Sequence, residues 1–197
     1  MVAYVFSRLI TRGRDAGYVP AQTSEARTWF REQAEATNVT PSRVINQSSE
    51  SSTSSISIPG NMVLFNYDPK TKANLPYYDR FPLIFVVERY SKGFLGINLH
   101  YLPLNYRAIL MDNLYELLNN KNYNESTRLR LSYEVLKSAS RFRYAKPCFK
   151  QYLDERVRSR FINIDVNQWD VALFLPLQRF EKANKTRIYR DSVRKFQ

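Results

Sequence analysis

The stretch from Gly60 to Pro103 constrains the fold of this chain more than any other part of its sequence. Three runs rich in Val, Ile, Phe and Leu, at Met62–Tyr67, Leu83–Val87 and Phe94–Leu99, are separated by segments that contain Asp, Pro, Asn and Gly. This pattern is typical of short strands joined by turns. Three antiparallel strands need a helix or a second sheet over their apolar face. We therefore expect a small β unit, as in part of an SH3-like barrel or a curled sheet, within an α+β domain.

The first 45 residues are predicted to form an N-terminal arm. An apolar stretch at Val2–Ile10 is followed by breaks at glycine and proline, and then by a short amphipathic helix from Ser24 to about Thr37, where Thr40-Pro41 is expected to end it. So short a helix is not stable alone in water, so it docks either on a neighbouring subunit or on its own core. The arm is expected to order only on assembly. The residues expected to contact a neighbour are Phe6, Leu9, Trp29 and Phe30.

Three further regions follow the arm. Residues 46–58 are rich in serine and are predicted to be a flexible linker. Residues 59–178 are predicted to be the α+β core domain, in which a helical C-terminal half follows the β unit, and residues 179–197 a basic tail. Within the core domain, apolar spacing predicts helices at Leu104–Leu118, Glu125–Ser140 and Cys148–Val157, and a short strand at Phe161–Val166.

The formal net charge of +12 is concentrated in the second half of the chain. The segments 121–160 and 179–197 carry the whole excess, since Lys and Arg balance Asp and Glu elsewhere. This predicts an acidic partner, whether nucleic acid, an acidic protein or a membrane surface, although a solvated basic face would give the same composition. The basic residues singled out, several of them interleaved with Tyr and Phe, are Arg128, Arg130, Arg141, Arg143, Lys150, Arg156 and Arg158.

The sequence contains few residues that could serve in catalysis. Its single histidine, His100, and single cysteine, Cys148, are far apart in the chain, and no Walker loop, dinucleotide fingerprint or zinc spacing is present. Asp79 is interpreted as a turn residue and His100 as a structural hydrogen-bonding residue at a strand end. We expect no enzymatic activity, cofactor or metal site. No stretch approaches the roughly 20 apolar residues of a membrane-spanning helix.

Two segments resemble a family of small virion structural proteins of contractile-tailed bacteriophages. They are FSRLITRGRDAGYVP with the following TWFREQA, and NYDPKTKANLPYYDRFPLIFVVERYSKGFLGINLHYLPLNYRAILMDNL, and the resemblance covers about residues 1–35 and 62–118. The resemblance implies no catalytic residue in this chain. It implies that a set of residues shapes the β unit: Asp79, Phe81, Pro82, Gly93, Phe94, Gly96, Asn98, His100 and Tyr101.

The resemblance and the residues together favour a non-enzymatic virion protein, assembled in the host cytoplasm and located in the phage tail. We expect a baseplate component, present in several symmetric copies, that locks neighbouring structural proteins together through its arm and its Tyr- and Arg-rich surfaces. The alternative is a phage protein that contacts DNA at the head–tail region or protects packaged DNA ends. The salt dependence of DNA binding discriminates between the two.

Overall fold

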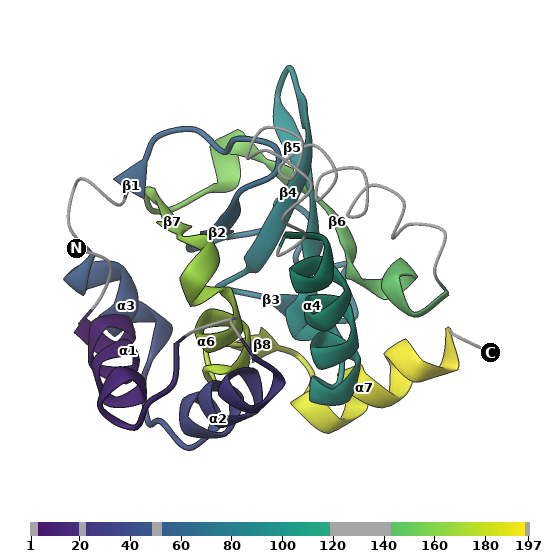
Figure 1. The fold of residues 1–197 in the computed structure, drawn as a ribbon. Helices are drawn as coiled ribbons and strands as arrows, with labels where there is room; N and C mark the ends of the chain where they lie inside the picture. The colour runs from purple at the N-terminus through teal and green to yellow at the C-terminus, as the bar shows by residue number, and fades with distance from the viewer. Residues whose placement is uncertain (1–3, 20–22, 49–52, 119–142, 196–197) are drawn as a thin grey trace.

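A six-stranded antiparallel sheet forms the centre of the fold (Figure 1). A computed structural model describes residues 4–19, 23–48, 53–118 and 143–195 of the 197-residue chain. The strands of the sheet, in the order β1-β7-β2-β4-β5-β6, are β1 (Thr53–Ser54), β7 (Phe161–Ile164), β2 (Met62–Leu64), β4 (Leu83–Tyr90), β5 (Gly93–Asn98) and β6 (Phe149–Leu153). A separate two-stranded sheet pairs β3 (Tyr78–Asp79) with β8 (Phe180–Glu181). The predicted α+β class is confirmed.

The helices gather on one side of the sheet (Figure 1). The α-helices are α1 (Tyr4–Asp15), α2 (Ser24–Glu35), α3 (Pro41–Gln47), α4 (Leu104–Leu118), α6 (Trp169–Phe174) and α7 (Lys185–Arg194). The 3-10 helices are η2 (Leu99–Tyr101), η4 (Arg143–Cys148), η5 (Asp154–Arg156) and η6 (Val166–Gln168). The predicted helix at Leu104–Leu118 is confirmed as α4.

Both faces of the central strands are buried. Met62 and Leu64 of β2 join the larger apolar core, to which the buried apolar residues of the helices also belong. Val63, between them, faces a second and smaller core around the ring of Phe65. Because successive side chains of a strand point to opposite faces, burial on both faces requires an almost unbroken apolar run. This requirement explains the composition of the predicted strands.

Two glycines allow close approach of neighbouring strands. A Cβ at Gly93 would lie 2.1 Å from the carbonyl oxygen of Tyr152, so β6 can pair with β5 only because this position has no side chain. A Cβ at Gly96 would lie 2.3 Å from Cδ1 of Ile84. A glycine inside a strand is typical of a bulge or a close approach. The structure shows the close approach, and the register shift lies on β4, between Val86 and Glu88.

The residues of the expected arm pack on the core of their own chain. Phe6, Leu9 and Phe30 are at most 1% exposed and belong to the larger core, while Trp29 is half-buried and stacks on Tyr18. For Phe6, Leu9 and Phe30 this placement corrects the expected role as contacts to a neighbouring subunit, because buried side chains are not available to one. For Trp29 that role stays a prediction. The placement agrees with the alternative of an arm folded on its own core.

Charged side chains hold α2 against two other helices. Arg31 donates hydrogen bonds to Asp170 of α6 and to Asp112 of α4, and Arg27 donates to the same Asp112.

Pro41 does not end helical structure but begins α3, which Thr40 caps with its side chain.

Parts of the expected linker and of the C-terminal half differ from the prediction. Thr53 and Ser54 form β1, which pairs with β7, and Ser57 is buried and accepts a hydrogen bond from Arg89. The predicted helix at Cys148–Val157 is wrong, because Phe149–Leu153 forms strand β6 on the free edge of β5. Pairing with an edge distant in sequence overrides local helix signals. The helix predicted at Glu125–Ser140 lies outside the described residues.

A buried arginine joins the sheet end to three helices. Arg107 of α4 is 0% exposed, and its Nε donates to the carbonyl oxygen of Leu102 at 3.0 Å. Nη1 donates to the carbonyl oxygen of Leu173 at 2.7 Å, and Nη2 to that of His100 at 3.2 Å and to the hydroxyl of Tyr189 at 2.7 Å. Leu173 belongs to α6, His100 to η2 and Tyr189 to α7, and Leu102 directly follows η2. Burial lowers the pKa of the guanidinium, so its hydrogen bonds offset a desolvation cost.

Replacing Arg107 by methionine is expected to lower the free energy of unfolding by about 3–5 kcal/mol, because the variant leaves three carbonyl groups and a hydroxyl without their buried donor. Denaturant unfolding of wild type and variant measures the difference.

The matched control is Arg8→Met, the same chemical change at an exposed position of α1. We expect the control to change stability by no more than about 0.5 kcal/mol. A similar small effect of Arg107→Met would show that the buried guanidinium does not hold these elements together.

Candidate nucleic-acid interface

Helix α7 presents a row of arginines to solvent. Ile188 and Ser192 are buried on the inner face of the helix, and Arg187, Arg190 and Arg194 are exposed at i, i+3 and i+7 spacing on the outer one. Among the described residues, Arg187 is the one arginine of this row with a carboxylate within 4 Å, that of Asp191 at 3.8 Å. The segment 179–197 holds seven Lys and Arg against two Asp and Glu. The helix therefore offers a row of positive charge of the kind that contacts phosphates.

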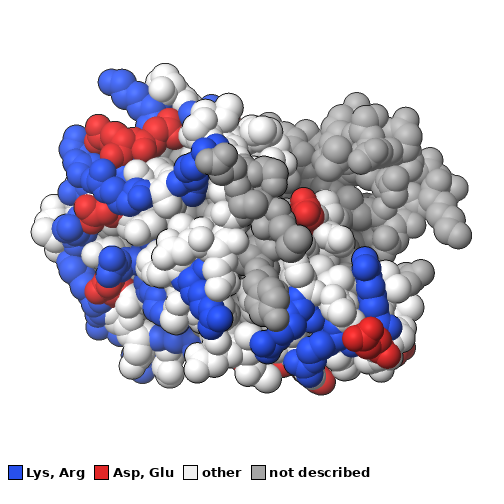
Figure 2. Space-filling model, turned by 90° about the vertical axis from the view of Figure 1, so that its left-hand side faces the viewer, with Lys and Arg blue, Asp and Glu red and all other residues white. Residues whose placement is uncertain are grey.

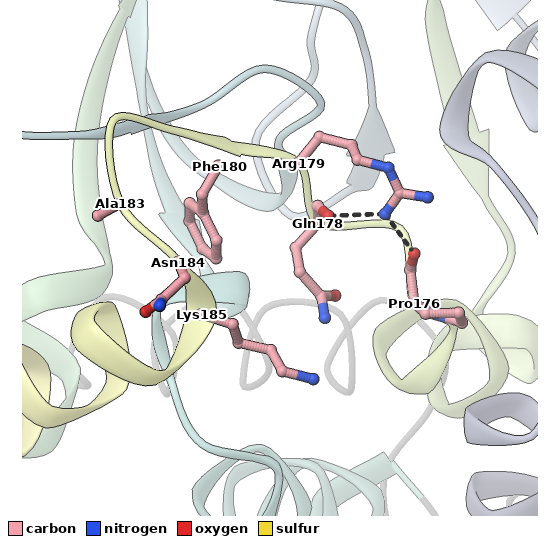
Figure 3. Close-up of a pocket in the computed structure, with 7 residues that line it drawn as sticks. All are labelled: Pro176, Gln178, Arg179, Phe180, Ala183, Asn184 and Lys185. Atoms are coloured by element: carbon pink, nitrogen blue, oxygen red, sulfur yellow. Dashed lines mark hydrogen bonds between the residues drawn. The ribbon is translucent and has the colours of Figure 1, made fainter.

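The connection from β8 to α7 is fixed by basic side chains that bond to backbone. Lys182 has a left-handed backbone, with φ at 68°, and its Nζ donates to the carbonyl oxygens of Lys72, Ala73 and Leu75 at 2.5–3.0 Å. Arg179 donates to the carbonyl oxygens of Pro176 and Gln178, as Figure 3 shows.

These bonds leave a hollow of about 370 Å³ beside the start of α7, onto which the side chains of Gln178, Phe180 and Lys185 face (Figure 3). The ammonium group of Lys182 and the guanidinium of Arg179 therefore bond to backbone, although both residues are exposed. Lys185 and the arginines of α7 are exposed to solvent as well.

Asp79 holds β8 and η2 together. Its Oδ1 accepts hydrogen bonds from the backbone nitrogens of Phe81 and Arg179, and its Oδ2 accepts from Asn98 and from Nδ1 of His100, the last at 2.6 Å. This agrees with the turn role expected for Asp79, and it extends that role, because one carboxylate also reaches a segment 100 residues away.

His100 supports Asp79 from within the core. The side chain is 0% exposed, and burial lowers its pKa even though the Asp79 carboxylate opposes that shift. A neutral His100 that donates from Nδ1 to Asp79 fits this geometry. Cys148 is also buried, and burial raises the pKa of its thiol to about 12. Neither group has the access to solvent that a nucleophile or general base needs.

A cavity lined by tyrosines lies next to this polar cluster. Its volume is about 600 Å³, and its walls come from the segment 67–79, from η2 and from β6. We call it the tyrosine cavity. Its aromatic lining residues are Tyr67, Tyr77, Tyr78, Tyr101, Phe149 and Tyr152.

The tyrosine cavity lies near α7, because η2, which carries Tyr101 of the cavity lining, packs against that helix. Lys150 of β6 also lines the tyrosine cavity, and its Nζ lies 4.2 Å from the centre of the Tyr101 ring. Burial lowers the pKa of Lys150 to about 8, and the nearby charge of Lys195 adds to the shift. Among the described residues no ion pair of Lys150 with a carboxylate is present. A phosphate placed here would stabilise the charged form of the amine.

The other basic residues predicted from the sequence occupy several places. Arg128, Arg130 and Arg141 lie outside the described residues, as does the side chain of Arg143. Arg158 lines a polar cleft of about 470 Å³ with Lys72 and Arg80, where each of these three cations lies within 4 Å of Asp68 or Glu181. Arg156 lies beside Glu155 at 3.4 Å. These pairings reduce the positive charge that Arg156 and Arg158 offer to a partner.

Helices α1 and α3 lie on a second basic face. Arg8, Arg14 and Arg43 are exposed there, and Figure 2, which views this side of the molecule, shows Lys and Arg spread over the surface with fewer Asp and Glu between them. Within the part of the chain that the structure describes there are therefore two basic faces, and that of α7 is the one near the tyrosine cavity.

Several residues of the interface were not singled out from the sequence. The tyrosines of the cavity come from segments that are far apart in the chain, and only the run from Tyr67 to Tyr78, with its lysines, gave a local signal. The row on α7 was predicted only as part of the basic tail at residues 179–197, without the spacing of Arg187, Arg190 and Arg194. The remaining residues expected to shape the β unit lie where strands meet: Pro82 precedes β4, and Gly93 and Gly96 are in β5.

Comparison with known proteins gives one match. The family model described as phage T4 terminal DNA protecting protein matches residues 8–194, which is almost the whole chain. The chain matches none of the curated proteins and none of the solved structures with which it was compared. The expectation of a bacteriophage protein is confirmed, and the match supports the DNA-protecting alternative better than a tail or baseplate role. No helix in the described ranges has the length and apolar character needed to cross a bilayer.

Replacing Lys150 by methionine is expected to stabilise the protein at pH 7 by about 1–3 kcal/mol, because burial of the charged amine costs free energy that methionine avoids. The folded-state pKa, about 8, is below the ordinary value of 10.5, so this cost is present at pH 7 and disappears as the pH rises through that interval. The advantage of the variant should therefore narrow between pH 8 and 10.5. Denaturant unfolding at several pH values measures it.

Lys146→Met is the control, since Lys146 is exposed four residues earlier. A gain no larger in Lys150→Met than in this control would contradict the buried, charged state of Lys150.

Proposed function

The chain belongs to the phage T4 terminal DNA protecting protein family, and we propose that it binds the ends of double-stranded DNA and covers them without catalysis. The observation that carries this proposal is the family match over residues 8–194. What the family description says of DNA ends is here a proposal for this chain. The exposed arginines of α7, beside a cavity with aromatic walls, support it, because phosphate contacts supply affinity and aromatic side chains hold unpaired bases.

The charge of the proposed interface accounts for affinity but not for selection of ends. Lys and Arg that contact phosphates release counterions, which gives a log–log salt dependence of about −0.9 per phosphate for duplex DNA. That attraction is the same along the whole duplex. Preference for an end needs a feature that only an end can occupy, and the tyrosine cavity is the feature of the described surface that could supply it.

The proposal predicts that the protein binds a linear duplex more tightly than a covalently closed duplex of the same sequence. Fluorescence anisotropy over a salt series measures both. In the variant Arg187→Gln/Arg190→Gln/Arg194→Gln, the salt slope on the linear duplex should become shallower by roughly 2–3, because up to three phosphate contacts are lost. Glutamine keeps the helix propensity of arginine, so α7 should remain folded.

A matched variant decides between the two basic faces. Arg8→Gln/Arg14→Gln/Arg43→Gln removes the same charge from α1 and α3. We expect it to retain most of the wild-type slope. If this variant lost the slope while the α7 variant kept it, DNA would bind the opposite face, and equal binding of linear and closed duplex by wild type would overturn the preference for ends.

A further inference from the structure

The tyrosine cavity combines features that suit a single nucleotide. Its volume, about 600 Å³, lies in the range of sites for small ligands. Tyr67, Tyr101 and Tyr152 are at most 7% exposed and form its fixed walls, with the rings of Tyr67 and Tyr152 edge to face at 5.0 Å. Tyr77 and Tyr78 are only half-buried. The cavity therefore has rigid aromatic walls and two tyrosines that are more open to a ligand.

The polar groups of the tyrosine cavity are unequally engaged. The carboxylate of Asp79 already accepts four hydrogen bonds, so its charge is shared among four donors. The hydroxyl of Tyr67 accepts from the backbone nitrogen of Leu153, and that of Tyr152 from Asn98. Lys150, by contrast, has the aromatic face of Tyr101 as its partner. A ligand with a flat aromatic part and an adjacent negative charge would complement this arrangement.

The cavity can be reached by a base only after that base leaves the duplex. An internal base must break its pair and two stacking contacts, whereas the last base of a strand has one stacking neighbour and an unpaired overhang has no pair to break. The loop that forms one wall is held in place by the three bonds from Lys182 to its carbonyl groups, so the cavity is a preformed site. Occupying such a preformed site therefore costs less for a base at an end than for an internal base.

We infer that the tyrosine cavity receives the unpaired terminal nucleotide of a DNA strand, with its base against the tyrosine rings and its phosphate beside Lys150. This inference rests on the proposed function, to which it adds the chemical basis for recognising an end. The arginines of α7 then contact the duplex that follows the terminal nucleotide, since α7 packs on η2, which carries Tyr101 of the cavity. The arginines of α7 then supply affinity for any duplex, and the tyrosine cavity supplies the preference for its end.

Binding of three DNAs of one sequence tests the inference: an open duplex with a one-nucleotide overhang, an open blunt duplex, and a duplex closed at both ends by hairpins. Wild type should bind them in that order of decreasing affinity. Tyr77→Ala and Lys150→Met should each weaken binding to open DNA, Tyr77→Ala by about 5-fold to 150-fold, the range for loss of one base–aromatic stack. Neither should change binding to the closed duplex. The α7 variant should weaken binding to all three.

The controls are Tyr90→Ala and Lys146→Met, the same changes at exposed positions outside the cavity. A second measurement needs no variant: 5-iododeoxyuridine at the terminal position should photocrosslink to the peptide that holds Tyr77 and Tyr78, and the same group placed several pairs inside should not.

The outcomes separate the two claims. If wild type binds open and closed duplex equally, or binds no DNA, the proposed function fails and the inference fails with it. If wild type prefers open DNA while Tyr77→Ala and Lys150→Met keep the same preference and no terminal crosslink reaches the cavity, the proposed function stands and the inference is overturned. In that case the cavity would be free for another ligand, such as a side chain of a partner protein.

Discussion

The buried guanidinium of Arg107 is the interaction on which the rest of the structure depends. A charge can be buried only where its donors meet acceptors, and the acceptors of Arg107 come from η2, α6 and α7. These elements cannot separate without exposing unpaired groups. Asp79 imposes a second constraint of the same kind, since it joins β8 to η2. Together the two residues fix the position of α7, and hence of its exposed arginines, beside the tyrosine cavity.

The same polar networks explain the distribution of charge at the candidate interface. Basic side chains that bond to backbone, such as Lys182 and Arg179, build the connection to α7. The arginines on its outer face and Lys150 in the tyrosine cavity carry charge that the fold itself does not need. Lys150 is partly buried, and the lowered pKa of its amine indicates a cost to stability, which is common for groups retained for binding. The proposed division between a charged helix for the duplex and a cavity for its terminal nucleotide follows from this difference.

The sequence predicted what local patterns determine and missed what distant segments build together. Strands β2, β4 and β5 and helix α4 follow from apolar runs and their breaks. Strand β6 was predicted as a helix from its local sequence. Its pairing with β5, which is about 50 residues away, could not be read from that local pattern. Arg107 was not expected in the core because an arginine on a helix is ordinarily exposed. The tyrosine cavity draws on three separate segments, so no local spacing could reveal it. The exposed row on α7 was visible in sequence only as a basic tail.

Protection of DNA from a processive exonuclease tests the central claim most directly. The substrates are linear duplexes of two lengths at the same concentration of ends. A protein that covers ends should protect both lengths at the same amount of protein per end, and the α7 variant should lose this protection while Arg8→Gln/Arg14→Gln/Arg43→Gln keeps it. If the amount of protein needed for protection grew in proportion to duplex length, the protein would be coating the whole DNA. That result, or degradation unchanged at saturating protein, would contradict a role at DNA ends.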